Sequence, residues 1–123
     1  MNRFFAATMM LAALFVSVAT AETMVVDDNG YPIQALAAGT TQTASYSANT
    51  EITNTVGGTG ETVVRLVCTT NCHFDCTEAT PTATTADPFL PALIVEYIRV
   101  NNANRCSFIQ NSSSGTAYVT EMQ

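Results

Sequence analysis

The chain has 123 residues, which is room for one domain, and its formal net charge is −6 at pH 7. All four basic residues are arginines, and ten carboxylates oppose them. Nucleic acids and anionic membranes are bound by clustered basic side chains that neutralise phosphates, so neither is expected as a partner. The sparse charge and the frequent threonines are typical of β structure, because branched side chains fit a pleated surface.

Residues 1–21 contain the three parts of an export signal. Arg3 gives a positive start, residues 4–18 form an apolar run without charge, and residues 19–21 are small. The run is shorter than the roughly 20 apolar residues of a spanning helix, so we expect export with cleavage after Ala21 and no stable membrane association afterwards. The alternatives are a retained N-terminal anchor and a start of translation at Met24, which would give a cytoplasmic product.

Residues 22–44 are predicted to form an N-terminal arm and a connector in front of the main domain. A turn is expected around Asn29-Gly30, because this pair tolerates positive φ. Residues 37–44 are small and polar, which is typical of a flexible connector. Short apolar pieces flank the turn, so we expect residues 24–36 to pack against an edge of the domain, in their own chain or a neighbour's, by strand addition.

Residues 45–123 alternate short β-like runs with turn signals. In the clearest run, residues 62–68, buried apolar side chains are expected to alternate with an outward-facing Arg65. The other predicted strands are residues 45–53, 72–76, 93–100, 106–110 and 117–121. Residues 80–91 hold three of the four prolines and are predicted to form a long loop. No amphipathic helix follows, so the expected fold is all-β, a small antiparallel β-sandwich or jelly-roll-like barrel of about seven short strands.

The cysteines are Cys68, Cys72, Cys76 and Cys106, and in an exported chain they would form disulfides. If residues 69–71 connect an antiparallel hairpin, Cys68 lies opposite Cys72, at a Cβ separation of roughly 4.5–5.5 Å. This favours a Cys68–Cys72 disulfide and leaves Cys76 to pair with Cys106. The alternative, in a cytoplasmic product, is that the cysteines are free buried thiols.

The sequence offers little for catalysis. His73 is the only histidine, and strand alternation points it away from the neighbouring cysteines, which disfavours a zinc site. Asp75 shares its face, but an exposed histidine beside an aspartate is more simply a solvated surface pair than a catalytic dyad. Asp27 and Asp28 precede a turn and are more simply turn formers than calcium ligands. We therefore predict no catalytic, cofactor-binding or metal-binding residues and no enzyme activity.

The order of several stretches resembles a group of small proteins that tailed bacteriophages encode. The stretches are residues 25–36, 64–67, 72–74, 81–85, 89–92, 95–98, 108–110 and 115–122. Together they cover most of residues 25–122, and their order and spacing are more specific than any single motif. The family members are similar to virion accessory proteins, of the head-decoration or minor structural type, and many have no assigned function.

The resemblance implies a non-enzymatic protein of the virion that self-associates as a homo-oligomer or docks on a capsid or tail lattice. It carries over no catalytic or binding residues. Two features depart from the family pattern: the segment that precedes Met24, and the cysteines at positions 68, 76 and 106. These departures fit an exported and disulfide-stapled chain, and they fit equally well an upstream start that adds residues 1–23 together with buried free thiols. The alternative function, from a different class, is an exported β-sandwich binding module at the cell surface or in the periplasm.

Overall fold

The computed structural model describes residues 28–31, 35–57, 60–101 and 103–123, in two units that comprise residues 1–34 and 35–123. The predicted signal segment lies outside the described residues, as do residues 22–27 and 32–34 of the predicted arm and most of the segment 24–36 that was expected to pack against a domain edge. The expected turn is present, with Gly30 at a φ of 82°. Among the described residues, no helix has the length and apolar character of a membrane span.

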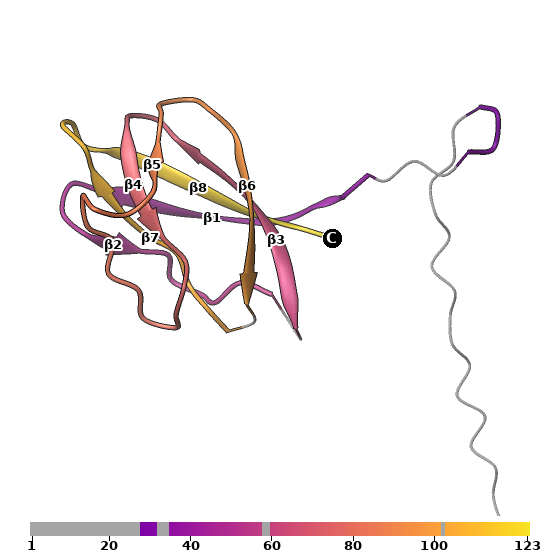
Figure 1. Cartoon of the computed structure of the whole chain (residues 1–123), viewed down its shortest axis with the longest axis horizontal. Coiled ribbons are helices and arrows are strands. Elements are labelled where there is room, and N and C mark those ends of the chain that lie inside the picture. The colour runs from indigo at the N-terminus through magenta and orange to yellow at the C-terminus, as the bar shows by residue number, and fades with distance from the viewer. Residues whose placement is uncertain (1–27, 32–34, 58–59, 102) are drawn as a thin grey trace, which may run out of the picture. The chain divides into compact units, whose positions relative to one another are not determined.

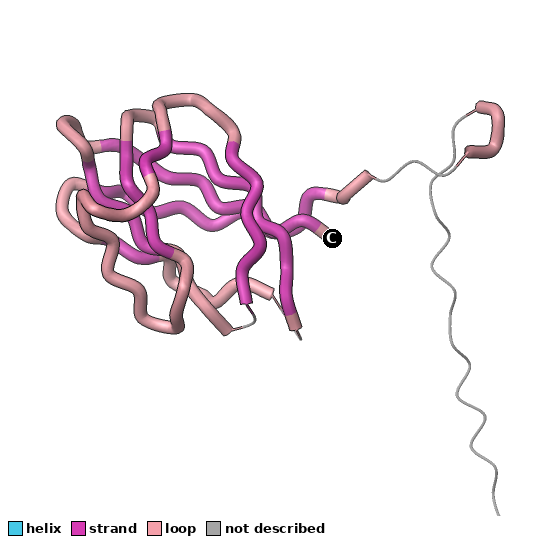
Figure 2. Tube along the Cα trace, viewed as in Figure 1, coloured by secondary structure: helices cyan, strands magenta, loops and turns pink. Residues whose placement is uncertain are grey.

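The second unit is built from eight strands. They are β1 (Ala38–Tyr46), β2 (Thr50–Glu51), β3 (Glu61–Cys68), β4 (Cys72–Asp75), β5 (Phe89–Leu90), β6 (Glu96–Asn101), β7 (Ser107–Gln110) and β8 (Gly115–Met122). They form two four-stranded antiparallel sheets, in the orders β1-β8-β3-β6 and β2-β7-β4-β5. Figures 1 and 2 show the sheets as two layers. The predicted fold class, a small all-β sandwich, is confirmed.

The core lies between the sheets and receives alternate side chains from each strand. From β3 it receives Val64, Leu66 and Cys68, as the alternation in residues 62–68 predicts. Tyr46 from β1 and Phe108 from β7 are the largest fully buried side chains, and their ring centroids lie 6.4 Å apart. These rings come from opposite sheets, so their contact joins the two layers.

The predicted connector at residues 37–44 is wrong, because β1 already begins at Ala38. Strand pairing with β8 does not require large side chains, and along β1 the side chains of Ala44 and Tyr46 are buried while Thr43 and Ser45 remain exposed. Small polar residues therefore form a strand here, since tertiary pairing outweighs their weak local preference.

Three other predicted boundaries also change. The expected strand 45–53 is split, because β1 ends at Tyr46 and the chain crosses to the other sheet before β2. The expected strand 93–100 starts only at Glu96, and its first residues belong to the β5–β6 connection. The long proline-containing loop is present, except that Phe89 and Leu90 pair with β4 as β5.

The two ends of the second unit lie side by side. Ala37 donates its N–H to the carbonyl oxygen of Gln123 (2.6 Å) and accepts a hydrogen bond from the N–H of Gln123 (2.8 Å). From there β1 and β8 run antiparallel until Tyr46 lies opposite Gly115. Tyr46 and Gly115 therefore lie at the opposite end of the sandwich from Ala37 and Gln123.

All four cysteines form disulfides, and the favoured pairing of Cys68 with Cys72 and of Cys76 with Cys106 is confirmed. The hairpin argument that led to the first pair is wrong. β3 pairs with β6 and β8, whereas β4 pairs with β5 and β7, so Cys68 and Cys72 lie in different sheets. The Cys68–Cys72 disulfide therefore links the two layers at the turn where the chain crosses between them.

The Cys76–Cys106 disulfide has a different role. Cys76 follows the last residue of β4 and Cys106 precedes β7, next to the paired residues Asp75 and Ser107. This disulfide therefore joins two neighbouring strands of one sheet, and it closes a much longer stretch of chain than the first, 30 residues against 4.

We expect the two disulfides to contribute unequally to stability. In the chain-entropy description, closing the longer loop stabilises the fold by about 3–4 kcal/mol and closing the shorter by about 2 kcal/mol. Cys76→Ala with Cys106→Ala should therefore lower the free energy of unfolding more than Cys68→Ala with Cys72→Ala, as measured by urea denaturation. Equal losses would contradict this explanation.

Candidate functional site

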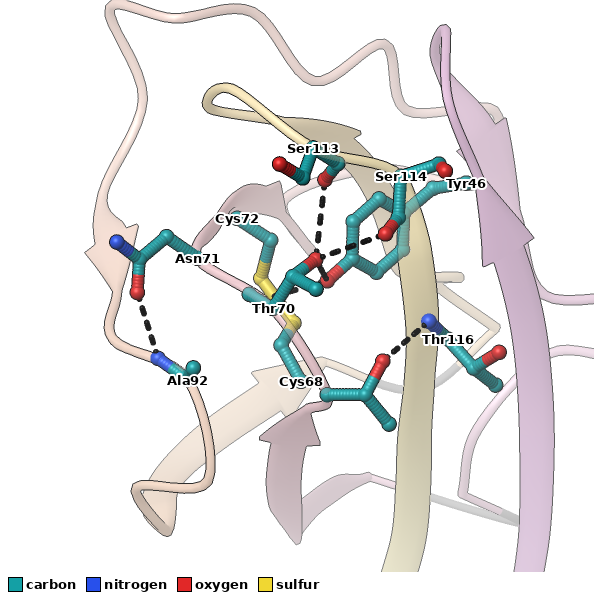
Figure 3. Close-up of a disulfide and its surroundings, with 10 residues drawn as sticks. Tyr46, Cys68, Thr70, Asn71, Cys72, Ala92, Ser113, Ser114 and Thr116 are labelled. Carbon is teal, nitrogen blue, oxygen red and sulfur yellow. Dashed lines mark hydrogen bonds between the residues drawn. A yellow bond between two sulfur atoms is a disulfide. The ribbon is translucent and has the colours of Figure 1, made fainter.

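The turn that connects β3 to β4, residues 69–71, ties together one end of the sandwich (Figure 3). The hydroxyl of Tyr46 donates to the carbonyl oxygen of Thr70 (2.8 Å), which fastens the end of β1. The Thr70 hydroxyl donates to the carbonyl oxygens of Ser113 (3.0 Å) and Ser114 (3.2 Å) in the β7–β8 turn. One threonine side chain thereby fixes the turn between two other strands.

The neighbours of Thr70 extend this network. Thr69 accepts a hydrogen bond from the N–H of Thr116 through its hydroxyl (2.8 Å) and donates its own N–H to the carbonyl oxygen of Thr116 (2.9 Å). Asn71 accepts the N–H of Ala92 at its side-chain oxygen (2.9 Å), and its carbonyl oxygen accepts the N–H of Asn111 (3.1 Å). The turn and the Cys68–Cys72 disulfide therefore hold the β5–β6 connection as well as β8.

The β5–β6 connection and the start of β6 carry a group of exposed apolar side chains, which we name the docking segment after the role proposed below: Leu93, Ile94, Val95 and Tyr97. Leu93 is 72% exposed and Tyr97 is 55% exposed. The segment does not hang loosely, because the N–H of Leu93 donates to the carbonyl oxygen of Cys68 (2.8 Å). In Figure 1 this connection passes over the same end of the sandwich as the β3–β4 turn.

Leu93 has an unusual backbone conformation, with a φ of 61°. The N–H of Ile94 donates to the carbonyl oxygen of Pro91 (3.3 Å), so Leu93 takes the third position of a tight turn, where glycine or asparagine is usual. A leucine in this region costs roughly 1–2 kcal/mol. The fold therefore holds a strained residue whose large side chain points into solvent.

His73 is not the exposed residue that we predicted. It is only 8% exposed, its Nδ1–H donates to the carbonyl oxygen of Asp87 (2.9 Å), and its Nε2 lies 3.2 Å from Oδ1 of Asn111. Its ring also packs against Phe89, at a centroid distance of 5.4 Å. The loop before β5 covers this face of β4, a contact between distant segments that alternation within one strand does not reveal.

The predicted surface pair of His73 and Asp75 is also absent. The carboxylate of Asp75 instead accepts hydrogen bonds from the N–H (2.9 Å) and the hydroxyl (2.7 Å) of Thr77. Both residues thus serve to hold loops in place. Because the four cysteines are all oxidised, they offer no thiolate to a metal, and no three His, Cys, Asp or Glu side chains meet as metal ligands within the described ranges.

An open depression lies beside the β3–β4 turn. It is lined mainly by hydroxyl-bearing residues: Ser45, Tyr46, Ser47, Ser114, Gly115 and Thr116. Hydroxyl groups can hydrogen-bond a polar molecule. The lining contains no carboxylate, imidazole or amine to transfer a proton near neutral pH, so the depression is not equipped for acid–base chemistry.

The sequence predicts a strand over residues 93–100 and therefore does not indicate the docking segment, whose first three residues precede β6. Their sequence carried a usable signal, since three consecutive large apolar residues cannot all face one core from a strand with alternating sides. The positive φ of Leu93 had no such signal, because nothing in a leucine side chain favours that conformation.

Comparison of the chain with protein-family models, with curated proteins and with solved structures finds no match. The similarity to tailed-bacteriophage proteins therefore stays a prediction, and the geometry of the sandwich is the basis for the proposals below.

Gly115 provides a test of the network around the β3–β4 turn. A Cβ atom at this position would lie 2.7 Å from the hydroxyl oxygen of Tyr46 and 2.8 Å from that of Thr69, and closer still to the hydroxyl of Thr70. Gly115→Ala should therefore lower the free energy of unfolding by about 1–3 kcal/mol, as overpacking does elsewhere. The matched control is Ser112→Ala, an exposed change in the neighbouring turn, and similar urea midpoints for the two variants would contradict the close approach.

Proposed function

We propose that this protein is a non-enzymatic structural component that self-associates through the docking segment. The observation that carries the proposal is a run of exposed apolar side chains on a backbone that is fixed in place. Scattered exposed apolar residues are ordinary, whereas a cluster of them marks an interaction site. Five of the eight large apolar residues that are exposed in the described chain fall within residues 89–97.

The way in which the segment is held supports the same proposal. Asn71 binds Ala92 and the carbonyl oxygen of Cys68 binds Leu93, so the backbone has little freedom left to lose on association. Strained backbone of the kind seen at Leu93 is concentrated at binding sites and active sites, where the surrounding structure maintains it. The surrounding structure here is the β3–β4 turn with its disulfide.

The absence of enzyme activity is part of the proposal. Both ring nitrogens of His73, the single histidine, face oxygen atoms of loops that they hold in place. The carboxylates of Asp75 and Asp87 likewise accept hydrogen bonds from the threonines beside them. These groups are engaged in maintaining the fold.

Two settings are compatible with self-association, and a different observation favours each. The resemblance to tailed-bacteriophage proteins favours repeated copies on a capsid or tail lattice. The two disulfides and the signal-like residues 1–21 favour an exported binding module at the cell surface or in the periplasm, because disulfides persist in oxidising compartments.

Intact mass and N-terminal sequencing of native protein separate these settings. An exported chain should begin at Glu22 and gain the mass of four hydrogen atoms on reduction, two for each disulfide. A chain that begins at Met24 with four alkylatable thiols would contradict export and favour assembly inside a cell.

Leu93→Gly tests the docking segment directly. The change removes an exposed side chain and relieves the positive φ, so the free energy of unfolding should stay within about 1 kcal/mol of wild type. Self-association, measured by sedimentation velocity over a range of concentrations, should nevertheless weaken.

The control for backbone relief is Ala103→Gly, because Ala103 is the other described non-glycine residue with a positive φ, at 64°. This variant should associate like wild type. A wild-type chain that stays monomeric at every concentration, or equal association of wild type and Leu93→Gly, would contradict the proposed function.

A further inference from the structure

The outer face of the β1-β8-β3-β6 sheet has an unusual composition. In an antiparallel sheet with one solvated face, apolar side chains point inward and polar ones outward. β3 follows this rule on its inner side, but beyond the exposed Glu61 at its start its outward-facing residues are Val63, Arg65 and Val67, and these three are partly buried. A strand that is apolar on both sides is typical of a sheet that is covered on both faces.

The neighbouring strands continue this pattern, as the register shows. Val67 lies opposite Tyr118 of β8, and Val63 lies opposite Met122 of the same strand. Arg65 lies between Thr120 of β8 and Tyr97 of β6. The outer face thus presents two guanidinium groups, Arg65 beside Tyr97 and Arg99 opposite Val63. Tyr97 connects this face to the docking segment.

Arg65 differs from the other arginines of the described chain in having no partner. Arg99 forms an ion pair with Glu61 (3.0 Å), and Arg105 forms one with Glu51 (3.2 Å). Arg65 forms neither an ion pair nor a hydrogen bond with any side chain in the ranges that the structure describes. It is therefore the one described cation left free on a strongly acidic protein.

We propose that a second copy of this chain covers the outer face and places one of its carboxylates on Arg65. The proposal rests on the self-association proposed above and names the chemistry by which it occurs. Tyrosine and arginine are the residues that dominate binding energy at protein interfaces, and here they lie side by side on one sheet. A carboxylate is the group that a guanidinium binds best, through paired hydrogen bonds.

The contact is head-to-tail and not symmetric. A two-fold contact centred on Arg65 would bring the two Arg65 side chains together, and like charges in contact repel each other. A different surface of the second copy must supply the carboxylate. Glu78 and Glu96 are exposed and form no ion pair among the described residues, so each copy carries the complementary group. Head-to-tail contacts generate closed rings or growing chains, which is how a protein repeats over a lattice.

The experiment is sedimentation velocity on the processed chain, residues 22–123, comparing wild type with Arg65→Gln, Arg99→Gln and Leu93→Gly at one ionic strength. Arg65→Gln and Arg99→Gln remove the same charge from the same face, but Arg99 already has an intramolecular partner. Arg65→Gln should raise the dissociation constant about tenfold, the loss expected for a hydrogen bond to a charged group. Arg99→Gln should stay within about twofold of wild type, because exposed ion pairs contribute little. Thermal unfolding of each variant verifies that the fold is retained.

The outcomes separate this inference from the proposed function. If the Arg65→Gln and Arg99→Gln variants associate equally while Leu93→Gly associates more weakly than wild type, the role of Arg65 is contradicted and the role of the docking segment is supported. If Arg65→Gln weakens association while Leu93→Gly does not, a contact through the outer face is supported and a contact through the docking segment is contradicted. A wild-type assembly that stops at a dimer would overturn the head-to-tail contact, and a wild-type monomer at every concentration would overturn both proposals.

Discussion

The two layers of this sandwich are held in register by a turn of three residues that a disulfide closes. Cys68 and Cys72 belong to different sheets, so the covalent bond between them fixes the separation of the layers where the chain crosses. The turn also provides hydrogen-bond partners for backbone groups of three other segments, through Thr69, Thr70 and Asn71. These hydrogen bonds are exposed, so each contributes only about 0.5–1.5 kcal/mol, but together they fix the positions of the three segments. The turn and its disulfide therefore determine where the β5–β6 connection and the β7–β8 turn lie at this end of the sandwich.

Much of the fold could be predicted because it is local in sequence. The alternation of residues 62–68 identified β3 and its buried side, and the cysteine count with the strand phase led to the observed disulfide pairs. The assignment of strands to sheets could not be predicted in this way. A short turn permits either a hairpin or a crossing between layers, and the choice depends on β8 and β7, which lie 39 residues or more along the chain from Cys68. The predicted Cys68–Cys72 disulfide is thus correct, although the predicted hairpin between β3 and β4 is not.

The candidate site was less accessible to prediction than the fold. Burial of His73 depends on Asp87, in a loop 14 residues further along the chain. That Arg65 has no ion-pair partner among the described residues depends on which strands flank β3. Both are properties of tertiary contacts, which a periodic pattern in one strand does not contain. The conformation of Leu93 depends on the carbonyl oxygen of Cys68 and on the turn at Pro91, so it too is set by its surroundings.

The pairing of Ala37 with Gln123 gives the sandwich a polarity. Ala37 and Gln123 lie at one end of the β domain, while the β3–β4 turn and the docking segment occupy the other, where Tyr46 lies opposite Gly115. A copy attached to a larger body through either terminus would therefore hold its docking segment outward, away from the point of attachment. In that arrangement the length of β1 would separate the point of attachment from the docking segment.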